Sequence, residues 1–128
     1  MGFFRNIFRP ARRANDFNVI VSDADWTQEW IDIFSSQVVS VDANFISKYV
    51  IVQIRQLKTN HIQDLIFHLI EDKGKMVDEL RIMPIGTKNH EYAFQKGYLV
   101  SHSVSYDYDK VTPVIHTLTL QFDILKKF

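Results

Sequence analysis

The stretch "VSHSVSYDYDKVTPVIHTLTLQFDIL" occupies residues 100–125 and decides the fold. Each half alternates apolar and polar residues, and the short segment "KVT" before Pro113 separates the two halves. A period of two is typical of a strand that buries one face, and two such runs joined by a short turn predict a β-hairpin. We therefore expect one face of this hairpin to be core and the other face to be solvated.

The two predicted faces of the hairpin differ in chemistry. The inward face is predicted to carry Val100, His102, Val104, Tyr106, Tyr108, Leu118, Leu120, Phe122 and Ile124. The outward face is predicted to carry Ser101, Ser103, Ser105, Asp107, Asp109, Thr117, Thr119, Gln121 and Asp123. This second set contains no lysine or arginine, whereas exposed protein surfaces usually mix both signs of charge. The outward face is therefore predicted to be wet, smooth and neutral to acidic.

Most of the remaining chain is also predicted to be extended. β-Branched and aromatic residues recur in the segments 17–23, 37–42, 47–57 and 76–85. The first hairpin strand is predicted to begin near residue 92, with a bulge near Gly97. These segments give about seven strands and predict a mainly antiparallel sheet, closed as a barrel or packed as a sandwich.

One main helix is predicted after the segment 47–57. It starts near Asn60, a candidate cap, and ends at Lys73 and Gly74. Its apolar stripe consists of Ile62, Leu65, Ile66, Leu69 and Ile70. A helix or helical loop is also predicted over 24–37, where large aromatic residues at helical spacing, Trp26 and Trp30 among them, are expected to face the core. The fold class is therefore α+β, with an N-terminal arm (1–16) and one β domain (17–128).

Composition limits the function. The chain has 128 residues and no cysteine, so disulfides and thiolate metal sites are excluded, and its longest apolar runs are far too short to span a bilayer. All 15 acidic residues but only 11 of the 15 basic residues lie beyond residue 13, which gives that part of the chain a formal charge of −4. An acidic body repels phosphate, so a protein that grips a duplex is not expected.

The N-terminal arm, unlike the acidic remainder of the chain, is basic. Its apolar residues share a helical face beside arginines: Phe3, Phe4, Arg5, Ile7, Phe8, Arg9, Arg12 and Arg13. The interleaved arginines do not fit a secretory signal, and Asn6 does not fit a myristoylation signal. Three interpretations stay open: a membrane-surface anchor, an apolar patch packed on its own domain, or an inter-subunit arm that orders against a neighbouring copy. We expect the third and expect no membrane partner.

Catalytic chemistry is not expected from this sequence. It has no nucleophile elbow, glycine-rich phosphate loop or metalloprotease motif. His102 and His116 fall on neighbouring predicted strands and, with Asp107 or Asp109, offer one candidate metal site. Two isolated histidines within an apolar alternation are more typical of hydrogen-bonded core residues. We therefore expect no enzyme activity, no metal and no cofactor.

Three segments together resemble a known family. They are the predicted helix "HIQDLIFHLIED", the following strand "MVDELRIMPI" and the long ending "YAFQKGYLVSHSVSYDYDKVTPVIHTLTLQFDIL". Their order is similar to that of the tube proteins of contractile phage tails and of the related haemolysin-coregulated tube protein of type VI secretion. The resemblance covers roughly residues 17–125. It implies homo-oligomeric rings, commonly hexameric, that stack into a hollow tube for the passage of DNA or effectors.

The resemblance also assigns roles to residues and partners. The outward hairpin face would line the lumen: Ser101, Ser103, Ser105, Asp107, Thr117, Thr119, Gln121 and Asp123. Hydroxyls and carboxylates would hold water there without binding a moving duplex. The expected partners are other copies, tail or baseplate proteins and a sheath, in a virion tail assembled from protein made in the host cytoplasm. Alternatives are an initiator or terminator ring of the same fold, a monomeric β-barrel that binds a small ligand, and a metal-dependent enzyme using His102 and His116.

Overall fold

The computed structural model describes residues 17–71, 77–84, 91–106 and 114–127. The predicted arm and Asp107 therefore lie outside the described residues. The described strands are β1 (Phe17–Ser22), β2 (Val38–Asn44), β3 (Tyr49–Gln56), β4 (Val77–Pro84), β5 (Tyr92–Ser105) and β6 (Val114–Lys127). The helices are α1 (Gln28–Ser36) and α2 (Ile62–Glu71). None of the described helices has the length and apolarity needed to cross a bilayer.

The described strands form one six-stranded sheet in the order β1-β4-β5-β6-β3-β2, and each neighbouring pair is antiparallel. β1 and β2 are the two edges, so the sheet formed by the described residues is open. The prediction of a mainly antiparallel α+β fold is confirmed. The predicted closure is corrected, because this curved half-barrel has two unpaired edges and six described strands where about seven strands and a closed barrel or sandwich were expected.

The β5–β6 hairpin is the longest pairing in the sheet, with 14 residues in each strand. Its register places Ser101 opposite Thr119 and Ser103 opposite Thr117. Leu118, Leu120 and Phe122 are buried, whereas Ser101, Ser103 and Ser105 are exposed. The alternation read from the sequence is thus confirmed over the centre of the hairpin.

A bulge shifts this alternation at Val100. The β5–β6 register changes between Leu99 and Ser101, which leaves Val100 as the extra residue, 53% exposed. The inward placement predicted for Val100 is therefore wrong, because one inserted residue reverses the face. Tyr106 follows the last residue of β5 and is 75% exposed, so it is not part of the core as was predicted.

A second irregularity lies at Lys96, whose positive φ of 59° is uncommon for a residue with a Cβ. The next residue, Gly97, packs against the Phe122 ring so closely that a Cβ at position 97 would overlap it. The bulge predicted near Gly97 is therefore found within a few residues of that position. Glycine is required there because the aromatic ring fills the space that a side chain would need.

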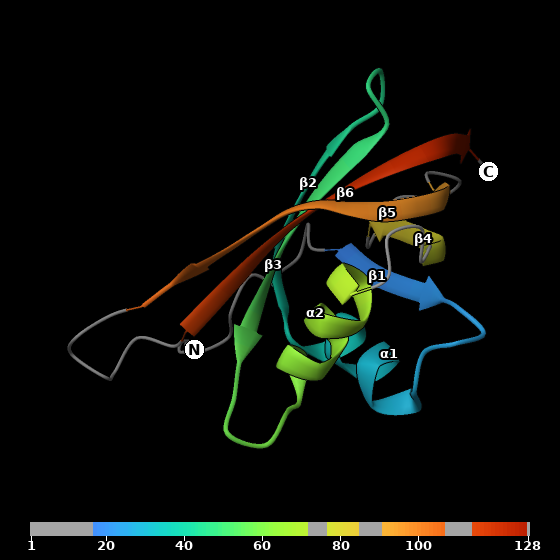
Figure 1. Ribbon diagram of the computed structural model, residues 1–128. Coiled ribbons are helices and arrows are strands. Elements are labelled where there is room, and N and C mark those ends of the chain that lie inside the picture. The colour runs from blue at the N-terminus through green and yellow to red at the C-terminus, as the bar shows by residue number, and fades with distance from the viewer. Residues whose placement is uncertain (1–16, 72–76, 85–90, 107–113, 128) are drawn as a thin grey trace, which may run out of the picture.

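α2 covers one face of the sheet with an apolar stripe (Figure 1). Ile62, Leu65, Ile66 and Leu69 are buried, but Ile70, predicted in the same stripe, is 50% exposed. Asn60 does not cap the helix; its side chain donates to the Arg55 carbonyl at 3.1 Å and accepts from the Leu57 amide at 3.3 Å. Asn60 therefore closes the turn between β3 and α2.

α1 lies on the same side of the sheet as α2 (Figure 1). The helix or helical loop predicted over 24–37 is thus found, and the described residues form two helices of similar length where one main helix was predicted. Thr27 caps α1, since its hydroxyl accepts from the Trp30 amide at 3.2 Å. Trp26 is buried and lies 5.3 Å from the Phe34 ring, and Trp30 lies 4.9 Å from the ring of His68 in α2. The prediction that the tryptophans face the core is confirmed, and Trp30 connects the two helices.

Candidate functional site

The face of the sheet opposite the helices, here called the open face, carries the predicted lumen residues. In the described part of the chain neither helix covers this face (Figure 1). The structure brings together seven of the eight predicted residues on β5 and β6: Ser101, Ser103, Ser105, Thr117, Thr119, Gln121 and Asp123. The eighth, Asp107, is outside the described residues. Whether these side chains line a lumen remains a prediction, because the structure contains a single chain.

The polar surface extends beyond the hairpin onto β3. Gln53 pairs with Thr117, and its side-chain amide donates to the Thr117 hydroxyl at 3.4 Å. Gln121 donates from its side chain to the Ser47 carbonyl at 2.6 Å. Arg55 lies two residues beyond Gln53 on the same face, and its guanidinium donates to the Gln37 side chain at 3.4 Å. A positive charge therefore borders the hydroxyl-bearing surface, although none lies among the predicted residues themselves.

A charged cluster on β4 and immediately before β5 was not predicted as part of this face. Glu79 and Arg81 alternate with the buried Leu80 and Ile82, so they point to the open face. Arg81 contacts Glu79 at 2.7 Å and Glu91 at 2.5 Å. Hydrogen bonds from Gln95 and then from Arg81 lower the pKa of Glu79, and bonds to Glu79 and Glu91 raise the pKa of Arg81. The cationic side chain is thus held between two carboxylates.

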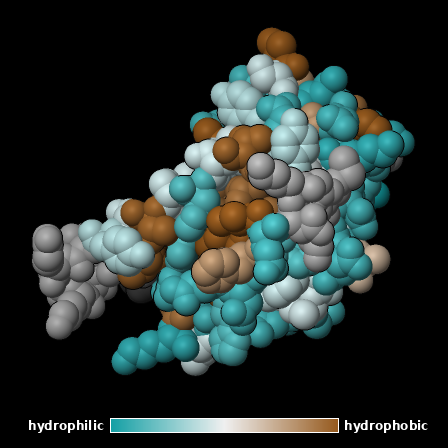
Figure 2. Space-filling view, viewed as in Figure 1, coloured by the Kyte–Doolittle hydropathy of each residue, from teal (hydrophilic) through white to brown (hydrophobic). Residues whose placement is uncertain are grey.

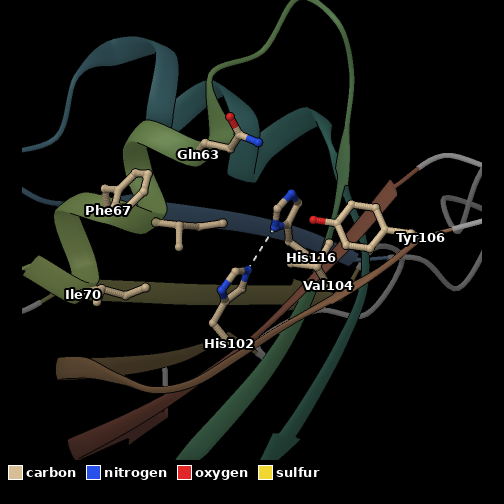
Figure 3. Close-up of a pocket in the computed structure, with 8 residues that line it drawn as sticks. Gln63, Phe67, Ile70, His102, Val104, Tyr106 and His116 are labelled. Atoms are coloured by element: carbon tan, nitrogen blue, oxygen red, sulfur yellow. Dashed lines mark hydrogen bonds between the residues drawn. The ribbon is translucent and has the colours of Figure 1, made fainter.

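A groove lies on the helix side of the sheet, between α2 and the far end of the hairpin (Figures 2 and 3). We call it the α2 groove; its volume is about 420 Å³. α2 contributes Gln63, Ile66, Phe67 and Ile70, and the hairpin contributes His102, Val104, Tyr106 and His116. Figure 2 shows apolar side chains gathered in the middle of this side of the molecule.

Two histidines at the groove are joined by a hydrogen bond (Figure 3). His102 Nε2 lies 3.0 Å from His116 Nδ1, and His116 Nε2 lies 2.5 Å from Gln56 Oε1. Because the Gln56 oxygen accepts, His116 Nε2 carries the proton, and His116 Nδ1 is left to accept from His102 Nε2–H. This order requires the His116 imidazole to be neutral, whereas His102 can donate from Nε2 in either protonation state.

Burial favours the same neutral state. His116 is only 3% exposed. Burial lowers the pKa of both histidines, and the neighbouring His102 lowers that of His116 further. The sequence correctly paired these two residues on adjacent strands. It did not indicate Gln56, which lies 60 residues before His116 and becomes its neighbour only through the β3–β6 pairing.

The candidate metal site combined the two histidines with Asp107 or Asp109, which lie outside the described residues, and the histidine pair alone has too few ligands for zinc. Protein zinc sites use three or four side-chain ligands, and among the described residues no group of three His, Asp or Glu side chains is placed to hold an ion. The two nitrogens that face each other also share a proton. The pair is better described as a buried polar link between β5, β6 and β3.

The described part of the chain forms an antiparallel half-barrel with both helices on one face, and this fold can be compared with those of known proteins. Among solved structures it is similar to the crystal structure of Hcp2 from Salmonella typhimurium, with a TM-score of 0.59 and 12% sequence identity. The likeness covers 88% of this chain and 84% of that chain. Neither the known family models nor the curated protein sequences match this chain. The Hcp-like part of the predicted resemblance is thus confirmed at the level of the fold.

Proposed function

We propose that this protein is a non-catalytic structural subunit that assembles into homo-oligomeric rings, which stack into a tube around a water-filled bore. The open face carries this proposal: a helix-free, hydroxyl-rich sheet surface on a fold similar to that of Hcp2. In a ring with this face inward, Ser103, Thr117 and their neighbours line the bore. The helices and the α2 groove then face away from it.

The sheet edges supply a route to ring closure. β1 and β2 end the sheet without a partner strand in the described chain. Unpaired edge strands present backbone N–H and C=O groups that readily pair with another chain. Pairing the β1 edge of one copy with the β2 edge of the next would extend one sheet around a closed ring and remove the exposed edges.

The bore chemistry suits a passing anion such as DNA. A duplex is bound mainly through cationic side chains that displace its counterions. The hydroxyl and amide groups of the open face carry no charge, Arg81 is held by Glu79 and Glu91, and Arg55, at the border of this surface, donates to the Gln37 side chain. We therefore propose a conduit of the phage-tail type, with DNA or an effector as cargo and with sheath, tail or baseplate proteins as outer partners. Within a tail, the chain could equally form an initiator or terminator ring.

The first experiment measures assembly. Purified protein is concentrated and examined by light scattering and negative-stain electron microscopy. The proposal expects closed rings or stacked tubes with a central hole. A chain that stays monomeric at high concentration would contradict the proposal and favour the alternative of a monomeric module that binds a small ligand.

The second experiment tests the direction of the open face. Ser103→Lys and Thr117→Lys together place two cations per copy on that face, and Gln28→Lys with Thr59→Lys places the same charge on exposed positions elsewhere. In assembled rings the first pair should raise affinity for duplex DNA much more than the second, with a steep dependence on salt. Equal effects of the two pairs would argue against an inward open face.

A further inference from the structure

Three large apolar or aromatic side chains at the α2 groove are at least half exposed to solvent. Phe67 is 65% exposed, Ile70 is 50% exposed and Tyr106 is 75% exposed. All three line the same groove, and the first two project from α2 (Figure 3). Large apolar side chains that cluster around a concave surface are typical of a contact with another chain segment.

Among the described residues of α2 and the hairpin, the charges beside the groove are of one sign. Asp64 and Glu71 are exposed, three residues before and four residues after Phe67, so they flank it on α2. α2 itself contains no lysine or arginine, and neither do the hairpin segments 98–106 and 114–125. The groove therefore fits a segment that presents apolar side chains and positive charges together.

One segment of this chain has that composition. Residues 1–13, which lie outside the described residues, contain four arginines and no acidic residue. Their apolar residues, Phe3, Phe4, Ile7 and Phe8, follow the i, i+4 spacing by which an amphipathic helix fills a hydrophobic groove. The arm thus complements the α2 groove in both apolarity and charge.

We propose that the α2 groove of one copy binds the N-terminal arm of a second copy. This inference rests on the proposed ring assembly for the identity of the occupant. The arm joins the domain at Phe17, the first residue of the edge strand β1. Residues 9–16, which link the apolar residues to Phe17, can extend about 29 Å at most, so the apolar part of the arm stays within that distance of this edge, which is where the next copy meets the sheet in the proposed ring.

Disulfide trapping tests the contact in the full-length protein, because the chain has no cysteine of its own. Asn6→Cys is introduced into one copy and Gln63→Cys into a second copy carrying a mass tag. Asn6 lies among the apolar arm residues without being one of them, and Gln63 is an exposed residue of the groove. Mild oxidation of the mixture should give a cross-linked heterodimer.

Two control variants define the site. Replacing Gln63→Cys by Ile46→Cys moves the thiol to the β2–β3 turn, where the side chain is 93% exposed, and should give little heterodimer. Adding Phe67→Glu to the Gln63→Cys copy puts a charge into the apolar groove and should lower the yield about tenfold. Circular dichroism checks that this variant stays folded. Equal cross-linking in all mixtures would overturn the inference.

The remaining outcomes separate this inference from the proposed function. The double variant Asn6→Cys/Gln63→Cys, oxidised at low concentration, should not close into a monomeric loop; if it does, the arm occupies its own groove and the second-copy contact is wrong. Electron microscopy of the same mixtures reports rings. Rings without the heterodimer would reject the arm contact alone, whereas the absence of both would reject the arm contact and the assembly together.

Discussion

The two faces of the β5–β6 hairpin differ in chemistry although the same two strands form both of them. On the helix side, Leu118 and Leu120 are fully buried and the His102–His116 pair is held by hydrogen bonds. On the open side, Ser103 and its neighbours are exposed hydroxyls. The helix side therefore provides most of the free energy of folding, and the open side contributes little to it.

This division explains why the open face tolerates an unusual composition. A face that contributes little to stability is free to be selected for what it meets. The helix side is constrained by close packing, to the point that Gly97 has no room for a side chain beside Phe122. Mutations on the two faces should therefore differ sharply in their effect on the free energy of unfolding.

The largest contrast is expected between two adjacent residues of β6. Leu118→Ala removes a fully buried side chain and should lower the free energy of unfolding by roughly 2 to 5 kcal/mol. Thr119→Ala, on the open face, should change it by about 0.5 kcal/mol or less. Chemical denaturation of both variants measures the difference. Similar losses for the two would show that the open face is packed as tightly as the core.

A smaller loss is expected at the Gly97–Phe122 contact. Gly97→Ala places a Cβ where the Phe122 ring lies, so the free energy of unfolding should fall by roughly 1 to 3 kcal/mol. Adding Phe122→Leu makes room, so the double variant should lose less than the sum of the two single variants. Additive losses would show that the strain comes from the backbone at position 97.

The next prediction concerns the histidine pair and pH. Burial lowers the pKa of His102 and His116 below the ordinary value of about 6.5. As the pH falls through that value, the unfolded chain takes up protons that the folded chain does not, so the free energy of unfolding decreases. Above about pH 7.5 both states are neutral at these positions, and the pair contributes no pH dependence.

Urea denaturation between pH 7.5 and 5.5 measures this dependence. His116→Gln removes the more buried imidazole, so the decrease in the free energy of unfolding over this range should be smaller than in the unmodified protein. His61→Gln, at a histidine whose side chain is 63% exposed, is the matched control. An unchanged pH dependence in the His116→Gln variant would show that the pair accepts protons within the fold.

The centre of the hairpin was predictable from the sequence because a period of two needs only local information. The face of Val100 was not, since a bulge inserts one residue without a distinctive sequence pattern. The open sheet was also not predictable, because its edges depend on β1 pairing with β4 and on β2 pairing with β3 alone. Strand order is a non-local property.

The α2 groove shows a second limit. Helical periodicity placed Ile70 in the apolar stripe but could not show that the sheet covers only part of that stripe, which leaves Ile70 exposed. Phe67, outside the predicted stripe, is exposed beside it. The link from His116 to Gln56 likewise requires the β3–β6 register. In contrast, the exposed serines of β5 were predicted because their alternation with apolar neighbours is visible in the sequence, whereas Glu79 and Arg81 of β4 were not assigned to this face.

The smallest expected effect tests the open face most directly. Ser103→Val adds an apolar, β-branched side chain opposite Thr117. In an isolated chain it should change the free energy of unfolding by about 0.5 kcal/mol or less, with a slight gain because valine favours strands. Thermal and urea denaturation of the monomeric chain measure it. A loss well above that range would show that the Ser103 hydroxyl has partners within the chain, and the open face would then belong to the fold and not to a bore.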